Sequence, residues 1–286
     1  MGNTNNGASR AYLALTRVFV PERSLDLGYK LITALNLMVK FAYSWAGEKP
    51  DINLRWRLND CLATVRFPDI QYRFHLRKNS DYNVYMNPYF HEYDITTFIH
   101  SVLKPGDVFV DAGAHAGSYT LQAANITGRG GKVISIEPNP ENLTYLKLNV
   151  LLNRLENVVV IPKAVGEANG KVTLFYDPSK TALTSIDRAF LGGQRRPKSF
   201  ETSLTTLDDN YLERVSPREI KVIKIDTEGN DLRVLSGARR TLSKTHHVIA
   251  EQNTNDARRF LSDEGFEIHD MRPSGYLLAT KSVVAA

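Results

Sequence analysis

The chain has 286 residues, of which 42% are hydrophobic and 23% charged, a composition typical of a folded globular protein rather than a disordered one. Its formal net charge is +5, but Lys and Arg are interleaved with Asp and Glu along the sequence. A solvated surface explains this charge better than nucleic-acid binding does, so no nucleic-acid partner is expected. The single cysteine, Cys61, excludes an internal disulfide and a cysteine-built metal cluster. We predict that it packs in the interior of a cytoplasmic protein.

The N-terminal part of the chain begins with a polar segment, residues 1–10, that we expect to be disordered. Residues 27–45 are more apolar, but Lys30 and Lys40 interrupt them, so no run approaches the roughly 20 apolar residues that a membrane span needs. This stretch predicts an amphipathic helix that packs on the domain. The alternative is a helix that lies on a membrane surface or binds a partner.

Residues 54–90 alternate aromatic, apolar and charged positions, which predicts a small antiparallel hairpin or meander. A helix is predicted over 91–103, because Lys104-Pro105-Gly106 would end it. We therefore place a domain boundary near residue 100, with an N-terminal extension or cap over 1–100 and the main domain over 101–286.

Apolar segments and helical patterns alternate regularly after residue 106, which predicts an α/β domain with a Rossmann-like, doubly wound and mainly parallel sheet. The predicted strands are 108–111, 132–137, 157–161, 221–226 and 246–251, and the predicted helices cover 118–125, 140–153 and a segment that begins near Asp231. Two further segments are predicted to be a hairpin (163–176) and an irregular loop near the site (177–200).

The segment VFVDAGAHAG predicts a strand, a sharp glycine turn and a helix whose N-terminus faces a ligand. Glu137, at the end of the next strand, lies where such folds place the carboxylate that accepts hydrogen bonds from a ribose. The turn lacks the G-x-G-x-x-G spacing of dinucleotide sites, and Asp111 would repel a pyrophosphate. A cationic ligand is favoured instead, so we predict S-adenosylmethionine rather than NAD.

A second acidic cluster follows the strand that ends in IKIDTEG. Strand ends of a parallel sheet converge on one crevice, so Asp111, Glu137, Asp226, Glu228 and Glu251 are predicted to line a single cavity. Each acid taken alone is equally consistent with a helix cap. Their joint placement favours a site.

The chain resembles the FkbM-type S-adenosylmethionine-dependent methyltransferases in its ordered motifs KPGDVFVDAGAHAGSYT, ISIEPNPENLTYLKLNV, KAVGE, TSLTTLDD and IKIDTEGNDLRVLSGA. The resemblance covers roughly residues 92–252. It implies a class I methyltransferase with a seven-stranded sheet whose last strand is antiparallel, acting on hydroxyl oxygens of sugars or secondary metabolites. The implied donor-binding set comprises Asp111, Gly113, Ala114, His115, Gly117, Ser118, Glu137, Pro138, Asn139, Ala164, Val165 and Asp226.

Within that set, the resemblance implies that Asp111, Gly113 and Gly117 hold the methionine end, Glu137 the ribose, and the region of Ala164 and Val165 the adenine. The family more often has Asn at the position of His115. We expect this histidine to be hydrogen-bonded to the backbone in a turn, the alternative being contact with the cofactor or substrate.

Methyl transfer to an alcohol needs an aligned acceptor and a group that takes the hydroxyl proton. Asp226 is the first candidate for that catalytic role, with Glu228 and Glu251 behind it; the alternative is that Asp226 only holds the donor's ammonium. A divalent metal at these three acids is disfavoured, and no metal is predicted. Two other functions remain open: an NAD-dependent oxidoreductase on a similar sheet, and a non-catalytic binding module that kept the fold.

Overall fold

The computed structural model describes residues 20–21, 61–66, 71–76, 92–177, 180–188, 197–209 and 218–281. Its centre is a seven-stranded sheet in which every neighbouring pair is parallel except those that involve β14. From one edge to the other the strands are β13 (Glu267–Asp270), β14 (Leu277–Thr280), β12 (Thr245–Ala250), β11 (Ile220–Ile225), β4 (Val108–Ala112), β5 (Lys132–Ile136) and β6 (Val158–Ile161). The predicted Rossmann-like sheet of class I methyltransferases, with its last strand antiparallel, is confirmed.

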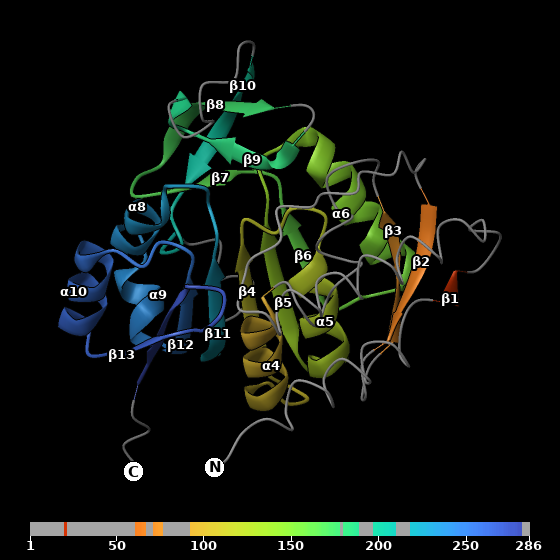
Figure 1. Cartoon of the computed structure of the whole chain (residues 1–286), viewed down its shortest axis with the longest axis horizontal. Coiled ribbons are helices and arrows are strands. Elements are labelled where there is room, and N and C mark those ends of the chain that lie inside the picture. The colour runs from red at the N-terminus through yellow and green to blue at the C-terminus, as the bar shows by residue number, and fades with distance from the viewer. Residues whose placement is uncertain are drawn as a thin grey trace, which may run out of the picture.

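Helices cover both faces of this sheet, as Figure 1 shows. They are α4 (Tyr93–Val102), α5 (Ser118–Thr127), α6 (Pro140–Leu152), α8 (Asp231–Ser236), α9 (Arg239–Ser243) and α10 (Asn255–Asp263). The helices predicted at 91–103, 118–125, 140–153 and from Asp231 are confirmed, and the five predicted strands agree with the structure to within a residue or so. Pro140 occupies the first turn of α6, and the Asn139 side chain caps it by accepting from the Glu141 amide.

Side chains alternate between the two faces along each strand, because successive residues of a strand point to opposite sides. In β4, Val108 and Val110 pack into the core beneath α8, α9 and α10. Phe109, between them in sequence, packs instead with Ile95 of α4 and Ala123 of α5. The sheet is thus buried on both faces, as parallel sheets require.

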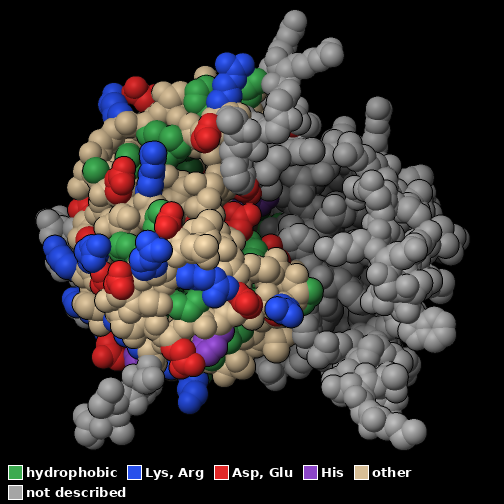
Figure 2. Space-filling view, turned by 60° about the vertical axis from the view of Figure 1, so that its left-hand side comes forward, with side chains coloured by type: hydrophobic (Ala, Val, Ile, Leu, Met, Phe, Trp, Pro, Cys, Tyr) green, Lys and Arg blue, Asp and Glu red, His purple; other side chains and the backbone are tan. Residues whose placement is uncertain are grey.

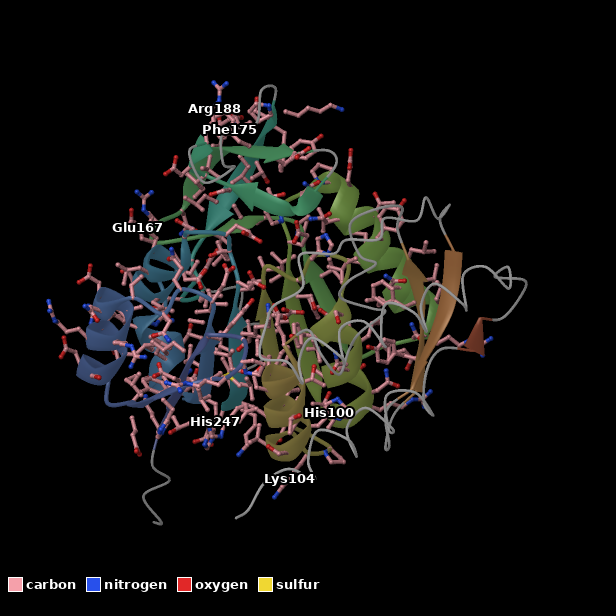
Figure 3. All side chains as sticks on the ribbon, in the orientation of Figure 1. His100, Lys104, Glu167, Phe175, Arg188 and His247 are labelled. Carbon is pink, nitrogen blue, oxygen red and sulfur yellow. The ribbon has the colours of Figure 1, made fainter. Side chains whose placement is uncertain are left out.

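A second, four-stranded sheet lies over the carboxyl ends of the central strands (Figure 1). Its order is β7 (Ala164–Val165), β10 (Lys198–Thr205), β8 (Gly170–Asp177) and β9 (Lys180–Ser185). Phe175 and Arg188 belong to this part of the molecule, whereas His100 and His247 lie toward the opposite end of the domain (Figure 3).

Two sequence predictions for this region are wrong. The hairpin expected over 163–176 does not form, because β10 inserts between β7 and β8, pairing parallel with one and antiparallel with the other. The segment 177–200 contains β9 and the start of β10 and is therefore largely β-structured where it is described. The chain does bend over residues 166–169, between β7 and β8. However, β10, from further along the chain, forms the hydrogen bonds to both of these strands.

The predicted hairpin of residues 54–90 appears as β2 (Cys61–Arg66) and β3 (Gln71–Leu76), which pair antiparallel, with the short β1 (Val20–Pro21) beside β2. Tyr72 and Phe74 of β3 are buried, and β3 packs against α5 and α6. The disorder predicted for residues 1–10 and the helix predicted over 27–45 lie outside the described residues, and the division into 1–100 and 101–286 stays a prediction.

The described face in Figure 2 carries Lys, Arg, Asp and Glu side chains dispersed among one another. In the part of the chain that the structure describes, no helix combines the length and the apolar character that crossing a membrane would require.

Candidate active site

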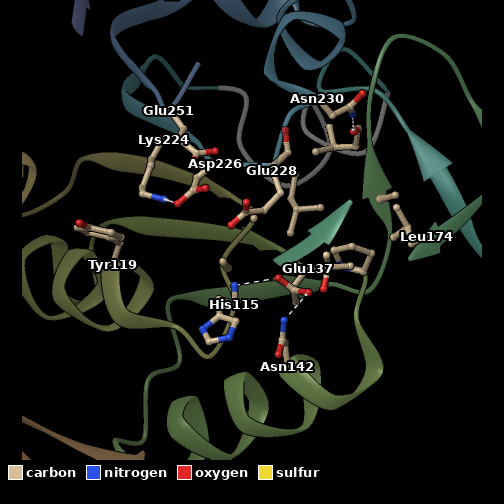
Figure 4. Close-up of a pocket in the computed structure, with 18 of the residues that line it drawn as sticks. His115, Tyr119, Glu137, Asn142, Leu174, Lys224, Asp226, Glu228, Asn230 and Glu251 are labelled. Carbon is tan, nitrogen blue, oxygen red and sulfur yellow. Dashed lines mark hydrogen bonds and ion pairs between the residues drawn. The ribbon is translucent and has the colours of Figure 1, made fainter. Parts of the chain in front are cut away.

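A cavity of about 430 Å³ opens at the carboxyl ends of β4, β5, β11 and β12, beneath the second sheet (Figure 4). Its volume is in the range of small-molecule sites. Most of the predicted site residues line it: Gly113, Ala114, His115, Ser118, Glu137, Pro138, Ala164, Val165, Asp226, Glu228 and Glu251. The structure thus brings together segments more than a hundred residues apart in sequence.

Gly113 allows the first turn to lie against the end of β11. A Cβ built on this residue would be 1.8 Å from the backbone oxygen of Asp226, and the glycine has a φ of +85°. Its amide and that of Ala114 donate to the carbonyl of Ile136 at 2.9 and 3.0 Å, which anchors the turn to β5 as well. Only glycine permits this close approach, which places the ends of three strands around one cavity.

Glu137 is a buried carboxylate held in a fixed orientation. Its Oε1 accepts from the Asn139 amide at 2.9 Å. Figure 4 shows its other two hydrogen bonds, from Asn142 Nδ2 to Oε1 at 3.2 Å and from the His115 amide to Oε2 at 2.8 Å. Burial raises the pKa of Glu137, while His115 and these N–H donors partly offset that effect. Among the described residues, Oε2 accepts only the bond from the His115 amide, so it retains capacity for a ligand hydroxyl.

His115 lies in the turn with a φ of 50°, and its amide donates to the Glu137 carboxylate. The expected hydrogen bond between this histidine and the backbone stays a prediction. Its side chain nevertheless lines the cavity. Glu92 and Glu228, which also line the cavity, have left-handed φ angles of 53° and 51°. Left-handed conformations are uncommon for residues other than glycine and concentrate at functional sites.

Three residues of the predicted donor-binding set do not line the cavity. Asp111 is 1% exposed, and its Oδ2 accepts from Thr120 Oγ1 at 2.6 Å. Burial raises its pKa, with the charge of Lys224 opposing that effect. Gly117 precedes α5 with a φ of 97°, and Asn139 is fully buried behind Glu137. The prediction that all five acids share one cavity therefore holds for four of them.

Asp226, Glu228 and Glu251 form a compact group in which one carboxylate oxygen from each lies within 4.8 Å of the others. Burial, and next the charge of Asp226, raise the pKa of Glu228 to about 8 and that of Glu251 to about 9. Oε2 of Glu251 is buried and has no hydrogen-bond partner among the described residues. At neutral pH these two carboxyl groups hold protons that a bound cation would displace.

Asp226 is surrounded by Lys224, Tyr119 and Tyr276, none of which was among the predicted site residues. Lys224 Nζ lies 2.8 Å from Asp226 Oδ2 and 4.8 Å from the ring centroid of Tyr119. Burial acts to lower the pKa of Lys224, but the charges of Asp226, Asp111 and Glu92 outweigh it and raise the pKa. Of the described residues that line the cavity, Lys224 is the one Lys or Arg.

The position of Lys224 beside Asp226 could have been predicted from the sequence. Lys224 precedes Asp226 by two positions, and residues two apart in a strand share a face. Glu92 and Tyr276 could not have been predicted in this way. They lie at the start of α4 and before β14, and only the tertiary fold brings them to the cavity. Leu174, Thr184 and Ile186 reach it from the second sheet and from the segment that follows β9, and were also missed, although a loop near the site was expected there.

Three hydrogen bonds tie the second sheet to the cavity wall. Asn139 Nδ2 donates to Thr184 Oγ1 at 3.0 Å, and Ser185 Oγ donates to the Glu228 carbonyl at 2.7 Å. On the other side, Asn230 Nδ2 donates to the Val165 carbonyl at 3.0 Å and holds β7 against the site. The second sheet therefore covers the cavity and contacts both the segment of Glu137 and the segment of Asp226 and Glu228.

These features fit S-adenosylmethionine. The end of the cavity near Lys224 carries Glu92, Asp226, Glu228 and Glu251, an excess of acids that suits a cationic ligand. The other end offers the oriented carboxylate of Glu137 next to the apolar Ile136, Val165 and Leu174, which suits a ribose and an adenine. Fold and cavity together define a class I methyltransferase.

Comparison with known proteins agrees with this class. A family model described as the methyltransferase FkbM domain matches residues 111–272. The hexuronic acid methyltransferase AglP of Haloferax volcanii is 26% identical over 160 residues, which cover 56% of this chain and 62% of AglP. A probable cobalt-precorrin-6B C(15)-methyltransferase (decarboxylating) of Sulfurisphaera tokodaii is 33% identical over 94 residues, covering 33% of this chain and 44% of that protein.

The crystal structure of methyltransferase FkbM from Methylobacillus flagellatus KT aligns with a TM-score of 0.42 and 19% identity, over 69% of this chain and 52% of that one. Each of these matches spans less than two thirds of the other protein. Because the family model covers more than half of the sequence, the chain belongs to the FkbM family of S-adenosylmethionine-dependent methyltransferases. Its cofactor is S-adenosylmethionine.

Proposed function

We propose that the protein transfers a methyl group from S-adenosylmethionine to a hydroxyl oxygen of a sugar or secondary metabolite. The observation that carries the proposal is the group of three carboxylates, Asp226, Glu228 and Glu251, in the same cavity as the glycine turn of the donor site. Carboxylates at this place can orient an alcohol and accept its proton. The sugar-acid acceptor in the name of AglP supports the choice of a carbohydrate.

The donor half of the cavity is proposed to divide as follows. Glu137 accepts from the ribose, and Ala164 and Val165 lie against the adenine, with Pro138 beside them. Gly113, Ala114, His115 and Ser118 border the methionine end together with Asp226. Asp111, Gly117 and Asn139 act from behind the cavity wall, through Thr120, the start of α5 and Glu137 respectively.

Bound S-adenosylmethionine supplies an electrophilic methyl group on a cationic sulfur. The protein's part is to exclude water, to align the acceptor oxygen and to take its proton. Lys224 and Tyr276 already donate to Asp226, so one oxygen of that carboxylate is engaged before an acceptor binds. Glu228, whose pKa of about 8 is close to neutrality, is better matched to accepting a proton, as is Glu251 with a pKa of about 9. We therefore propose that Asp226 orients the acceptor. Once the positive charge of the bound donor has displaced its own proton, Glu228 or Glu251 takes the proton of the acceptor hydroxyl.

The test is a transfer assay with methyl-labelled S-adenosylmethionine. Two matched acceptors, methyl α-glucopyranoside and methyl α-glucuronoside, are compared beside a fractionated cell extract, and the product is identified by mass spectrometry and NMR as an O-methyl compound. Calorimetry of S-adenosylmethionine binding runs in parallel. Donor binding without transfer to any acceptor would favour a non-catalytic module, and transfer to nitrogen or carbon would refute O-methylation.

A further inference from the structure

Asp226 is held from one side. Lys224 Nζ donates to its Oδ2 at 2.8 Å, and Tyr276 Oη donates to the same oxygen at 3.1 Å. Among the described residues, no side-chain hydrogen bond reaches Oδ1 of this carboxylate. Two donors on one oxygen fix the plane of a carboxylate and leave the other oxygen for a ligand in the cavity.

The two donors are themselves immobilised. The Lys224 side chain is 2% exposed and lies between the ring of Tyr119, 4.8 Å from Nζ, and that of Tyr276, 5.9 Å away. Tyr119 donates to Glu92 at 2.5 Å. The Tyr276 hydroxyl also lies 3.2 Å from Glu92 Oε1, so its single proton is shared between Asp226 and Glu92. Aromatic faces next to an ammonium stabilise its charge in a buried site. The arrangement therefore keeps a cation and a phenol hydroxyl at set positions behind Asp226.

The segment that carries Tyr276 is anchored to α4. Asp94 Oδ2 accepts from the Ser274 amide at 3.1 Å and from its hydroxyl at 2.6 Å. The amide of Met271 donates to the Tyr276 carbonyl at 2.9 Å and closes the turn before β14. The first turn of α4 thus holds both Glu92 and the turn of Tyr276 over the cavity.

We propose that Lys224 and Tyr276 are positioning residues that fix Asp226 with Oδ2 turned into the protein and Oδ1 turned toward the acceptor hydroxyl. The inference deepens the proposed function and rests on it. Methyl transfer requires the acceptor lone pair in line with the breaking bond, and a displacement of about 1 Å lowers such rates by about 100-fold. A carboxylate free to rotate would not hold an alcohol to that tolerance.

Ionisable groups from several elements pack around Asp226. These are Glu92 before α4, Asp111 on β4, Tyr119 on α5, Lys224 on β11, Glu228 and Asp231 after β11, Glu251 after β12, and Tyr276 before β14. Lys224 is the one cation among them, and its Nζ is 2.8 Å from Asp226 Oδ2. Removing Lys224 takes away this ion pair and leaves acids and tyrosines around Asp226.

The first experiment measures methyl transfer to whichever of the two glycosides the wild type accepts. We expect Tyr276→Phe to lower kcat roughly 10- to 100-fold, as loss of a hydrogen bond to a charged group does. The dissociation constant for S-adenosylmethionine should stay within about threefold, because the proposal assigns Tyr276 to the acceptor side. Lys224→Met, which removes the other hydrogen bond to Oδ2, should lower kcat by a similar factor with donor affinity retained, and Lys224→Arg should restore part of the activity.

Matched controls come from the second sheet. Tyr176→Phe retains the edge contact with Phe200, and Lys171→Met removes an exposed pair with Glu201, neither in the cavity. Both should behave as the wild type. Tyr276→Phe with unchanged kcat, or with donor binding lost in proportion to kcat, would overturn the proposal.

A second measurement does not need an acceptor. The resonance of the Asp226 carboxyl carbon is followed by NMR at one fixed pH in ¹³C-aspartate-labelled protein and assigned with Asp226→Asn. Lys224→Met and Tyr276→Phe should each shift this resonance, because each removes a hydrogen bond to Oδ2. An unshifted resonance in both variants would refute the positioning role even if transfer works. A shifted resonance in a protein that transfers to no acceptor would instead refute the proposed function and leave the positioning role in place.

Discussion

Replacing Gly113 by alanine tests the close approach on which the cavity depends. The added Cβ would be 1.8 Å from the oxygen and 2.8 Å from the carbon of the Asp226 carbonyl. Neither atom belongs to a flexible side chain. The Asp226 amide donates to Ala112 at 2.9 Å, so the two strand ends cannot part without loss of ladder hydrogen bonds. The clash has to be relieved by displacing β4 from β11.

Gly265 provides a matched control, since its φ of +84° is nearly that of Gly113, and a Cβ there would meet nothing within 4 Å. Gly265→Ala should therefore cost only the strain of a left-handed residue, about 1 kcal/mol of unfolding free energy. Gly113→Ala adds overpacking of about 1–3 kcal/mol, for a total of about 2–4 kcal/mol.

Urea denaturation of both variants measures the difference in unfolding free energy, and calorimetry measures S-adenosylmethionine binding. We expect Gly113→Ala to lose more stability than Gly265→Ala and to bind the donor more weakly. Equal losses of stability in the two variants, with donor affinity retained, would show that the strand ends tolerate a Cβ and that the close approach is not required.

Four other outcomes are expected. Glu137→Gln should weaken S-adenosylmethionine binding by about tenfold or more, since the side chain loses its charge and its NH2 group must face the N–H donors of one of the two former oxygens. Calorimetry measures this, and unchanged affinity would remove Glu137 from the ribose site. S-adenosylmethionine binding should tighten from about pH 6 to about pH 9, by up to tenfold per pH unit for each proton displaced, because Glu228 and Glu251 are protonated in the free protein and must ionise to face a cation. S-adenosylhomocysteine lacks the sulfonium, so its affinity should depend less on pH. Identical pH profiles of affinity for the two ligands would contradict the reasoning. In the absence of ligand the unfolding free energy should decrease over the same pH range, because carboxyl groups with raised pKa values favour folding only while protonated. Glu251→Gln should weaken this pH dependence of the unfolding free energy, which urea denaturation at several pH values measures. Methyl α-glucopyranoside should have a lower KM than methyl α-glucuronoside, because the end of the cavity near Lys224, where we place the acceptor hydroxyl, carries four acids and one lysine. The reverse order of KM in the transfer assay would place the acceptor elsewhere.

Much of the central domain was predictable from local patterns. Short β-branched runs that end in an acid identified β4, β5 and β11, and the proline and glycine around residue 105 marked the entry to the first of them. Because parallel strands end at one edge of the sheet, the same patterns placed Glu137, Asp226 and Glu228 at a shared cavity.

The second sheet was not predictable in the same way. A turn at Gly170 between two β-prone segments favours a hairpin, but the register was decided by β10, which pairs with both β7 and β8. Strand partners are chosen by packing and hydrogen bonding across the whole sheet, and local turn chemistry is one contribution among several. Asp111 is a second case in which local sequence did not predict the tertiary contacts. Its strand was predicted correctly, but its carboxylate accepts from Thr120 and does not line the cavity.

The sequence by itself determined the parallel sheet, the glycine turn and an acidic site that favours a cation, because periodicity and backbone freedom are local properties of a sequence. The tertiary structure alone decided that Lys224 and Tyr276 face Asp226 and that Glu92 joins them from before the sheet. Such contacts join residues as many as 184 positions apart. They arise only when the sheet has formed and its last strand has been placed between two others, so no short stretch of sequence records them.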